Sequence, residues 1–495
     1  MRILVIDIDT LRPDHLGCYG YHRNTSPNID RVAEGGVRFE NCYVTDAPCL
    51  PSRGALYNAR YGVHTGIVNH GGTNADLGIE GAPRGFKTSR ENWPWITALK
   101  DRGLYCASIS PFAERHSAWW FCAGWKEFHN PGKSGGERAD EVAPIAIDWI
   151  ERNAKRDDWL LHVNMWDPHT RYRTPMDFGD PFADEPPAAW LTEEIITRQR
   201  EGFGSHSARD TKHFEPHSPE DIENFPRLPA EIRNLADFTK WINGYDTGIR
   251  YADEWTGRIL AALEREGVLE ETAIIVTSDH GENQGELNVY GDHQTADHIT
   301  SRVPLIVRWP GVAGGRADRA LHYQMDLAPT VLELLGGESP KNWDAASFAA
   351  SLRAGTEAGR DFLVASQCAW SCQRMVRWGD WAFLRTYHDG LKDLPERMLF
   401  NLAEDPHETR DLAAERPDVV REGLARLDRW VGEVMSNSPF DVDPMWTVIR
   451  EGGPFHTRGR EEKYRKRLTE SDRAHHAAAI RERYARGEFA RKVEA

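Results

Sequence analysis

The sequence predicts an α/β fold: a large mixed, mostly parallel sheet sandwiched by helices, plus a small C-terminal α+β part with an antiparallel sheet. Short, continuously apolar runs recur through the first two-thirds of the chain, as in strands that are buried on both faces of a sheet. Stretches with helical periodicity lie between these runs. After about residue 340 short strands follow one another before a charged helix, which predicts the second sheet.

Five apolar runs are predicted strands of the large sheet: residues 2–8, 104–110, 159–166, 272–278 and 303–309. Five intervening segments have helical periodicity: residues 52–60, 93–102, 140–154, 236–266 and 325–336. This alternation predicts parallel strands joined by crossover helices. Ligands bind beyond the carboxyl ends of such strands, so the polar residues that follow them are candidate site residues.

Two domains are expected, a main α/β domain over residues 1–345 and an α+β subdomain over 346–495. In the subdomain, the runs DFLVAS, RMVRW, WAFLRTY and RMLFNL predict strands, and residues 410–434 predict a charged helix. Residues 170–235 are rich in Pro, Asp, Glu and His with little periodicity, which predicts an insertion or lid over the strand ends. The charged tail from residue 457 predicts a solvated helix, and an oligomer contact is the alternative.

Composition and charge exclude several classes of function. The 495 residues carry a formal net charge of −16, which argues against nucleic acid as a partner because phosphate binding needs a basic surface. No window is long and apolar enough to span a membrane. The N-terminal residues MRILVIDIDT form a strand at once and leave no room for a signal peptide, so we expect a cytoplasmic protein. The 18 tryptophans hint at a carbohydrate substrate, since indole faces stack on sugar rings.

Acidic and imidazole side chains follow two of the predicted strands. Asp9 ends the first strand in DIDTLRPDHLGCYG and shares a face with Asp7, because strand side chains alternate. Asp279 and His280 end another strand in TSDHGENQGE. A carboxylate next to an imidazole can ligate one divalent ion. A helix-capping or turn role is the better explanation of Asp9 when that residue is considered alone.

Cys49 stands between two prolines in APCLPSRGALYNARYG, before a predicted helix. The seven cysteines are an odd number without paired metal-type spacing, which fits free thiols in a reducing compartment. Arg53 would hold an anion beside Cys49 through charge-assisted hydrogen bonds. Free N–H groups at the start of the helix would attract the same anion. Cys49 is therefore a candidate reactive centre, and a buried inert thiol is the alternative.

The sequence resembles the type I, formylglycine-dependent sulfatases of the alkaline phosphatase superfamily. CLPSR matches their Cys-x-Pro-Ser-Arg signature. The segments that match the family in the same order are DTLRPDHLGCYG, SPNIDRVAEGGVRFENCYV, SDHGE, RVPLIVRWPG and LFNLAEDPHETRDLA. The resemblance covers most of the chain and is poorest in residues 170–235 and after residue 440.

The resemblance implies that Cys49 is oxidised after translation to formylglycine by a maturation enzyme that recognises the motif with Pro51 and Arg53. The hydrated aldehyde would then attack the sulfate sulfur, with Arg53 and a metal neutralising the sulfuryl oxygens. The family's metal ligands correspond to Asp9, Asp279, His280 and the modified Cys49. Many sulfatases have a second Asp where this chain has Thr10, so Asp7 or Thr10 is left to fill that place.

Oxygen ligands with one imidazole suit Ca²⁺ best, with Mg²⁺ and Mn²⁺ as alternatives. His169, in NMWDPHTRYRTP, corresponds to the family's strand-end histidine and is our candidate for the general acid.

Two further segments depart from the family pattern. SPFAERHSAWW replaces a Gly-Lys-x-His stretch, so that Arg115 and His116 stand in for that pair. In YGDHQTADH, Asp292 stands where the family has a substrate-facing lysine. His293 is then the expected active-site residue of this segment, and His298 is the alternative.

The expected function is hydrolysis of a sulfate ester in a sulfated saccharide or other small molecule. The runner-up is a phosphonate monoester or phosphodiester hydrolase of the same superfamily, which would use the same metal and nucleophile. A third alternative, a non-catalytic anion-binding or sugar-binding protein, should have a broken signature, whereas Cys49, Pro51 and Arg53 are all present.

Overall fold

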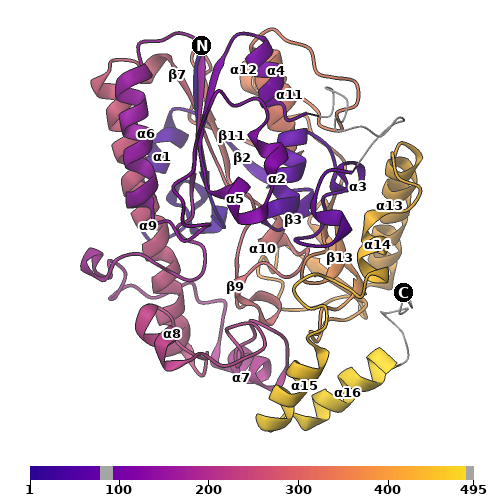
Figure 1. The fold of residues 1–495 in the computed structure, drawn as a ribbon. Helices are drawn as coiled ribbons and strands as arrows, with labels where there is room; N and C mark the ends of the chain where they lie inside the picture. Colours follow the sequence, from indigo (N-terminus) through magenta and orange to yellow (C-terminus); the bar gives the residue numbers. More distant parts are fainter. Residues whose placement is uncertain (79–92, 486–495) are drawn as a thin grey trace.

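The computed structural model describes residues 1–78 and 93–485, so residues 79–92 and the last ten residues of the predicted tail lie outside the described part. An eight-stranded sheet lies between two helical layers, and a five-stranded sheet lies beside it (Figure 1). The predicted fold class is confirmed. The predicted domain boundary at residue 345 stays a prediction.

The large sheet has the order β11-β2-β10-β7-β1-β6-β4-β5. Its strands are β1 (Arg2–Ile8), β2 (Val37–Tyr43), β4 (Tyr105–Ile109), β5 (Glu127–His129), β6 (Trp159–Met165), β7 (Thr272–Thr277), β10 (Leu305–Arg308) and β11 (Arg316–Tyr323). β1 lies between β6 and β7 and is parallel to both. β10 is antiparallel to both of its neighbours, which makes the sheet mixed. The central strands therefore end at one edge of the sheet.

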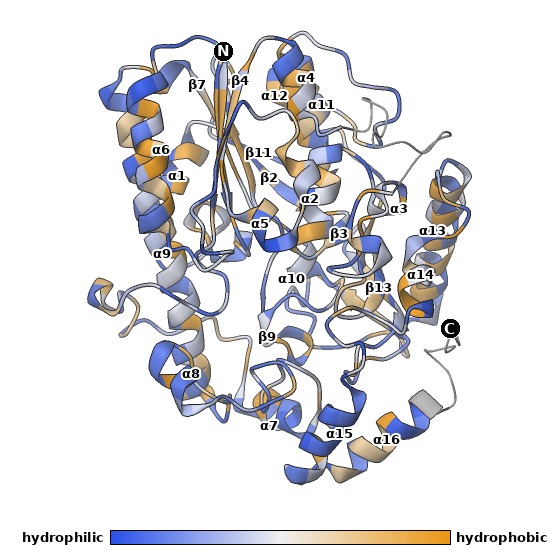
Figure 2. Ribbon diagram, viewed as in Figure 1, coloured by the Kyte–Doolittle hydropathy of each residue, from blue (hydrophilic) through white to orange (hydrophobic). Residues whose placement is uncertain are grey.

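Two apolar cores hold the helices to the faces of this sheet. One face packs against α1 (Pro27–Glu34), α6 (Ala139–Asn153) and α9 (Leu235–Arg265). The other face packs against α2 (Cys49–Asn58), α4 (Ile96–Asp101), α5 (Phe112–His116), α11 (Leu327–Leu334) and α12 (Ala349–Ala354). Figure 2 shows the hydrophobic strands between helices whose outer surfaces are largely hydrophilic. Apolar strands covered on both sides are the pattern from which the fold was predicted.

The second sheet has the order β15-β14-β13-β12-β3. Its strands are β3 (Asp46–Ala47), β12 (Leu363–Gln367), β13 (Cys372–Trp378), β14 (Trp381–His388) and β15 (Arg397–Asn401). The four C-terminal strands are antiparallel, as predicted, but β3 joins them in parallel with β12. This sheet therefore includes the two residues that precede the Pro48-Cys49 segment.

The helix predicted at residues 410–434 is α13 (Pro417–Ser436), which begins at a proline because a first-turn N–H needs no partner. It is followed by α14 (Pro444–Arg450). Shorter elements near the strand ends are α3 (Gly62–Thr65), α10 (His298–Ser301), β8 (Asn283–Gln284) and β9 (Tyr290–Asp292).

The charged tail forms α15 (Glu461–Glu470) and α16 (Ala474–Ala485). Tyr464 and Leu468 of α15 pack in an apolar cluster with Phe203 and Phe214, which lie between α7 (Glu193–Glu201) and α8 (Pro219–Asn224). Buried Asp210 accepts hydrogen bonds from Arg467 and Arg473. The tail is thus docked on the segment 170–235 (Figure 1). The sequence pattern instead predicts a helix surrounded by solvent.

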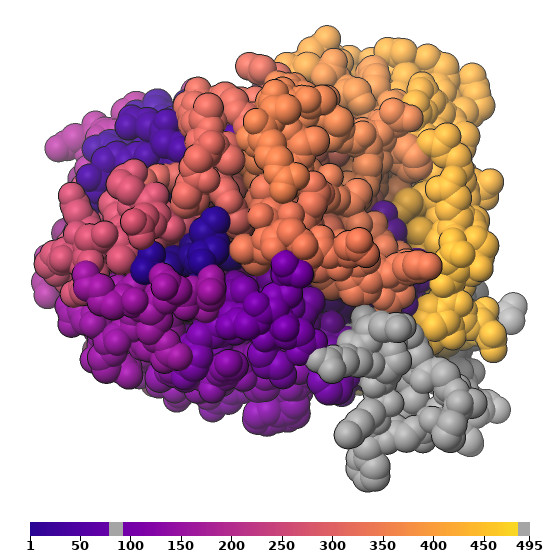
Figure 3. Space-filling model, turned by 90° about the horizontal axis from the view of Figure 1, so that it is seen from above, coloured from indigo at the N-terminus to yellow at the C-terminus, as the bar shows by residue number. Residues whose placement is uncertain are grey.

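Among the described residues, no helix combines the length and the apolar character that crossing a membrane requires. On the face where β1 begins, residues from the first third of the chain lie next to residues 260–360 (Figure 3). C-terminal residues lie along one side of this face. Segments distant in sequence thus share this face.

Candidate active site

Helix α2 begins at Cys49, three residues before the predicted start at residue 52. Pro51 fits in this first turn because the first four N–H groups of a helix have no intrahelical partner. All ten residues of the helix are buried. The Ser52 hydroxyl donates a hydrogen bond to the Asp279 carbonyl oxygen and so ties the turn to the end of β7. The motif therefore fixes Cys49 against the strand ends.

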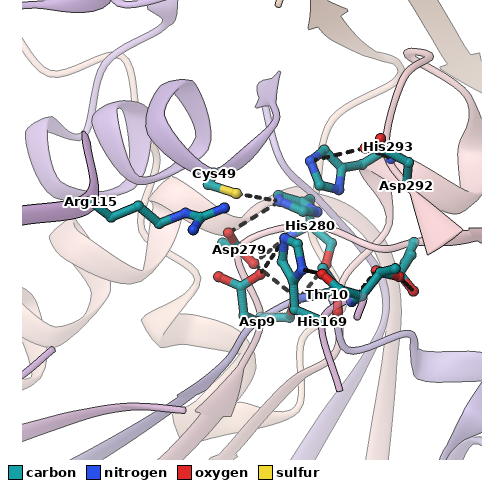
Figure 4. Close-up of polar contacts among 12 residues, drawn as sticks. Asp9, Thr10, Cys49, Arg115, His169, Asp279, His280, Asp292 and His293 are labelled. Atoms are coloured by element: carbon teal, nitrogen blue, oxygen red, sulfur yellow. Dashed lines mark hydrogen bonds and ion pairs between the residues drawn. The ribbon is translucent and has the colours of Figure 1, made fainter. Parts of the chain in front are cut away.

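Four side chains from three elements meet beyond β1 and β7. Ligand atoms of Asp9, Cys49, Asp279 and His280 all lie within 4.8 Å of one another, and all four residues are buried. The Cys49 Sγ lies 3.1 Å from His280 Nε2 (Figure 4). The four residues predicted to hold a metal are thus brought together.

Arg53 lies among carboxylates and is fully buried. Its Nη1 is 2.6 Å from Asp279 Oδ2 and 3.1 Å from Asp9 Oδ2, and its Nε donates to Asp7 Oδ2 at 3.0 Å. Arg53 is not one of the described residues that line the adjoining pocket. Arg53 thus holds the carboxylates that surround the nucleophile position. Its Nη2 has no hydrogen-bond partner in the described part of the chain, and its contact with the sulfuryl oxygens stays a prediction.

The carboxylates fit a divalent cation. Asp9 Oδ1 is buried and has no hydrogen-bond partner among the described residues. Burial and the neighbouring Asp279 raise the pKa of Asp9 well above its usual range, as expected for carboxylates that lack sufficient positive charge. A bound cation would satisfy both the unpaired oxygen and the excess negative charge.

Thr10 and Asp7 were the two candidates for the missing fifth ligand. The Thr10 hydroxyl is buried without a hydrogen-bond partner in the described part of the chain. Arg53 binds Asp7 Oδ2, but Asp7 Oδ1 is likewise buried without a hydrogen-bond partner among the described residues. Asp7 does not belong to the group of ligand atoms that lie within 4.8 Å of one another. Both residues thus stay candidates for the remaining ligand.

Burial and the carboxylates of Asp9 and Asp279 raise the pKa of the Cys49 thiol well above its usual value. A thiol with a raised pKa stays protonated at neutral pH, and the thiolate is the nucleophilic form of cysteine. The unmodified Cys49 side chain is thus a poor nucleophile in this environment.

Two histidines face Cys49 from the open side of the site. Ligand atoms of His169, His293 and Cys49 lie within 4.8 Å of one another, and the two imidazole rings are 5.6 Å apart (Figure 4). Burial lowers the pKa of both histidines well below the usual value. His169 Nδ1 donates to the Thr170 carbonyl oxygen, so in the neutral ring Nε2 is the free acceptor, 4.0 Å from Asp9 Oδ1.

In the segment that replaces Gly-Lys-x-His, Arg115 lines the pocket and its guanidinium lies 4.6 Å from the Trp166 ring centre. His116 packs beside Phe112 and His70 at 5.2 Å and 5.0 Å between ring centres. It is not among the described residues that line the pocket. Of the two residues that stand in for the family pair, Arg115 lines the pocket and His116 does not, and a catalytic role of His116 stays a prediction.

Asp292 occupies the position of the family lysine, in β9. Its carboxylate accepts the His293 N–H at 2.8 Å and the Gln294 amide at 3.0 Å, and lies 3.0 Å from His206 Nε2. His298 lies elsewhere, with its Nδ1 2.9 Å from the Tyr43 hydroxyl. His293 is therefore the histidine of this segment at the site, as expected.

The pocket above Cys49 has a volume of about 260 Å³. Sequence reasoning missed most of its lining, which comes from distant parts of the chain: His70, Thr170, Arg171, His206, Thr211, Lys212, His213, His217, Leu228, Gly291, Trp370 and His456. Eight of these residues lie in the range from position 170 to position 228, where the concentration of histidine was the available signal.

Among curated proteins, one relative is an N-acetylglucosamine-6-O-sulfatase of Bacteroides thetaiotaomicron. It is 22% identical to this chain over 519 aligned residues, which cover 91% of this chain and 89% of the relative. The two chains thus align over nearly their whole lengths.

Solved structures share the fold. A structure in complex with its substrate D-glucosamine-2-N,6-O-disulfate superposes with a TM-score of 0.69 at 20% identity, covering 88% of this chain and 99% of the other. A phosphonate monoester hydrolase from Silicibacter pomeroyi superposes with a TM-score of 0.64 at 19% identity, covering 91% and 98%. The family model described as Sulfatase matches residues 2–337, more than half of the chain. The protein is therefore a member of the sulfatase family.

Proposed function

We propose that this sulfatase hydrolyses a sulfate ester of a sulfated saccharide, with Cys49 converted to formylglycine by a maturation enzyme. A divalent cation, Ca²⁺ by preference, would be held by Asp9, Asp279, His280 and the modified side chain. The observation that carries the proposal is the meeting of Cys49 with these three residues at the floor of a histidine-lined pocket. Two carboxylates and one imidazole favour Ca²⁺, with Mg²⁺ and Mn²⁺ as alternatives.

Each group that the proposal adds to the chain supplies one kind of chemistry. A bound cation would offset charge on the sulfate and lower the pKa of a ligating hydroxyl, and the hydrated formylglycine would supply a hydroxyl as the nucleophile. Arg53 holds Asp7, Asp9 and Asp279 in place around them through its three hydrogen bonds. The chain thus orders the charges before the substrate arrives.

His169 is the proposed source of the proton for the leaving oxygen. Its Nδ1–H is held by the Thr170 carbonyl oxygen, which leaves Nε2 free to exchange a proton. An anionic sulfate close to the ring favours its protonated form and opposes the effect of burial. His293, whose ring centre is 5.6 Å away, is the second candidate.

Three cationic side chains in the pocket, Arg115, Arg171 and Lys212, support an anionic substrate. The N-acetylglucosamine-6-O-sulfatase relative and the structure that contains a disulfated glucosamine point to the same class of substrate.

The test compares substrates on protein that was produced together with a formylglycine-generating enzyme. We expect turnover of 4-nitrophenyl sulfate and of 6-O-sulfated N-acetylglucosamine, and weaker turnover of phenyl phosphonate monoesters. The Cys49→Ala variant, which lacks the side chain that becomes the nucleophile, is the negative control for each substrate. Failure to hydrolyse any sulfate ester, at full metal occupancy and with Cys49 modified, would contradict the proposal.

The second candidate is phosphonate monoester or phosphodiester hydrolysis. Asp292 in place of the family lysine favours it, since leaving-group contacts change at that position, and the phosphonate monoester hydrolase superposes over 91% of this chain. A kcat/KM for phosphonate monoesters above that for sulfate esters would select this candidate.

A further inference from the structure

A second cavity of about 430 Å³ adjoins the pocket and shares His213 and His456 with it. Its remaining described lining consists of Gly72, Phe214, Glu215, Phe455, Arg458, Arg460 and Lys463. Most of these residues come from the C-terminal part of the chain, beyond the stretch that matches the family model. The second cavity is therefore formed where the C-terminal tail packs on the segment around His213.

Basic side chains dominate both cavities although the chain carries a net charge of −16. The six basic residues in their lining are Arg115, Arg171, Lys212, Arg458, Arg460 and Lys463. Among the described residues, two acidic ones, Asp292 and Glu215, line the same space. Two acidic residues outside the lining also form ion pairs with it: Asp221 with Arg171 and Lys212, and Glu451 with Arg458. Counting these two, the six basic residues still exceed the four acidic ones by two. The joint cavity is thus a positive site on a negative protein.

The basic groups of the second cavity are available to a ligand. Arg460 makes no ion pair within the described ranges of the chain. Lys463 pairs with Glu215 at 2.7 Å, but the side chains are 51% and 46% exposed. Exposed ion pairs of this kind contribute little to stability, so an incoming anion can replace Glu215 at small cost.

Aromatic rings line the passage between the two cavities. The Trp370 ring stacks on His456 at 4.3 Å and on His213 at 5.3 Å between ring centres. Phe455, in the wall of the second cavity, is 47% exposed. Phe455 thus offers an exposed aromatic face close to Arg460 and Lys463, against which the apolar side of a sugar ring can pack.

We infer that the second cavity is an extension subsite that binds a further anionic sugar unit, so that the substrate is a multiply charged oligosaccharide. The inference rests on the proposed sulfatase function. The pocket alone, at about 260 Å³, lies below the roughly 300–1,000 Å³ of typical ligand sites. Joined to the second cavity, the space falls within that range. Arg460 and Lys463 hold the second anion, and Phe455 supports the sugar ring.

The first experiment measures binding by calorimetry with the Cys49→Ala protein, which cannot turn over. The probes are tetrasaccharides of heparin, chondroitin sulfate and carrageenan, with 6-O-sulfated N-acetylglucosamine as the short control. We expect at least one tetrasaccharide to bind about tenfold or more tightly than the monosaccharide, with an affinity that falls as salt rises. Equal or absent binding of all three tetrasaccharides would overturn the inference.

The second experiment places Arg460→Gln and Lys463→Gln together in the same background. We expect the ratio of tetrasaccharide affinity to monosaccharide affinity to fall by about tenfold. Lys466→Gln is the matched control, because its side chain is on the same helix, 77% exposed, and pairs with Glu470 instead of lining the second cavity. An unchanged ratio in the folded double variant, judged by its thermal midpoint, would overturn the inference.

Turnover separates this inference from the proposed function. The active enzyme should prefer the bound tetrasaccharide to 4-nitrophenyl sulfate, and the double variant should lose that preference. If no sulfate ester is hydrolysed, the proposed function fails. If 4-nitrophenyl sulfate and the monosaccharide are hydrolysed but chain length makes no difference, the extension subsite alone fails.

Discussion

At the scale of single residues, Arg53 explains why the motif requires an arginine four positions after the cysteine. Arg53 lies one turn of α2 after Cys49, and its guanidinium contacts three buried carboxylates. Several N–H groups on one planar cation can bind carboxylates from β1 and from the end of β7 at the same time. Lysine has a single charged atom and could not hold Asp7, Asp9 and Asp279 in the same way.

His169→Ala tests the assignment of the leaving-group acid. A sugar alkoxide leaves poorly without a proton, whereas nitrophenolate leaves well unaided. General acid catalysis typically contributes about 10²–10⁴-fold. We therefore expect kcat on a sugar sulfate to fall by that factor and kcat on 4-nitrophenyl sulfate to fall far less. An equal fall on both substrates would instead assign His169 to positioning and make His293 the better candidate for the acid.

The strand-end residues Asp9, Asp279 and His280 could be predicted because short-range pattern determines where a strand ends. The positions of His206, Trp370 and His456 could not, because they depend on how loops far apart in sequence come together. Sequence could not tell Arg115 from His116 for a related reason: neighbouring residues of the short helix α5 face different directions, and only Arg115 of the two lines the pocket.

At the scale of elements, helix α1 is capped from another helix. Its N-cap residue, Ser26, makes no side-chain capping bond. Instead the buried carboxylate of Asp253, on α9, accepts the N–H groups of Asn28 and Ile29 at 3.0 Å and 2.8 Å. The cap therefore also fastens two helices of one layer to each other.

We expect Asp253→Ala to lower the free energy of unfolding by about 1–3 kcal/mol, because it leaves buried N–H groups without an acceptor. Glu254→Ala is the control, since that neighbouring side chain is 41% exposed and forms an ion pair with Arg258 on the same helix. Chemical denaturation measures both variants. Equal effects of the two substitutions would contradict the capping role.

The loop between β14 and β15 buries Lys392, whose ammonium donates to the Ser205 carbonyl oxygen at 2.5 Å. Burial lowers the pKa of Lys392 to about 7, although Asp292 and Asp210 oppose the shift. Between pH 7 and the usual lysine pKa of about 10.4, the unfolded chain binds a proton that the folded chain lacks. Stability from this group therefore rises with pH across that window.

Lys392→Met removes this pH dependence. We expect the free energy of unfolding of the parent to increase relative to the variant between pH 7 and pH 9, by at most about 1.4 kcal/mol per pH unit. Denaturation of both proteins at the two pH values gives the difference. A constant difference would show that Lys392 has an ordinary pKa in the folded protein.

In the smaller sheet, four of the five strands could be predicted from the sequence and one could not. Its four C-terminal strands follow from their apolar patterns, whereas β3 was missed because two residues carry no periodicity. Its partner β12 is more than 300 positions away in the chain. Long-range pairing of so short a strand is decided by the folded structure, not by local sequence.

At the scale of the whole molecule, the proposed cation would join parts of the chain that are far apart, because Asp9 follows β1, Asp279 follows β7 and Cys49 begins α2. Chelation should therefore abolish turnover first and lower the thermal midpoint as the metal leaves. A ligand at 100 times its Kd stabilises the folded state by about 2.7 kcal/mol.

The measurement titrates EGTA or EDTA against activity and thermal midpoint, with metal content determined by elemental analysis. Addition of Ca²⁺ should restore both, and Asp279→Asn should lose both. Glu271→Gln is a suitable control, because that surface carboxylate is 70% exposed at the opposite end of β7. Full activity in metal-free protein would contradict the proposed metal site.

The central claim is that Cys49 is the precursor of the nucleophile, and peptide mass spectrometry tests it most directly. Protein with sulfatase activity, purified from its natural host, is digested, and the peptide with CLPSR is analysed after treatment with an aldehyde-reactive hydrazine. We predict that this peptide has the mass of formylglycine at position 49 and forms the hydrazone. A fully active protein whose Cys49 is entirely an unmodified thiol would contradict the account.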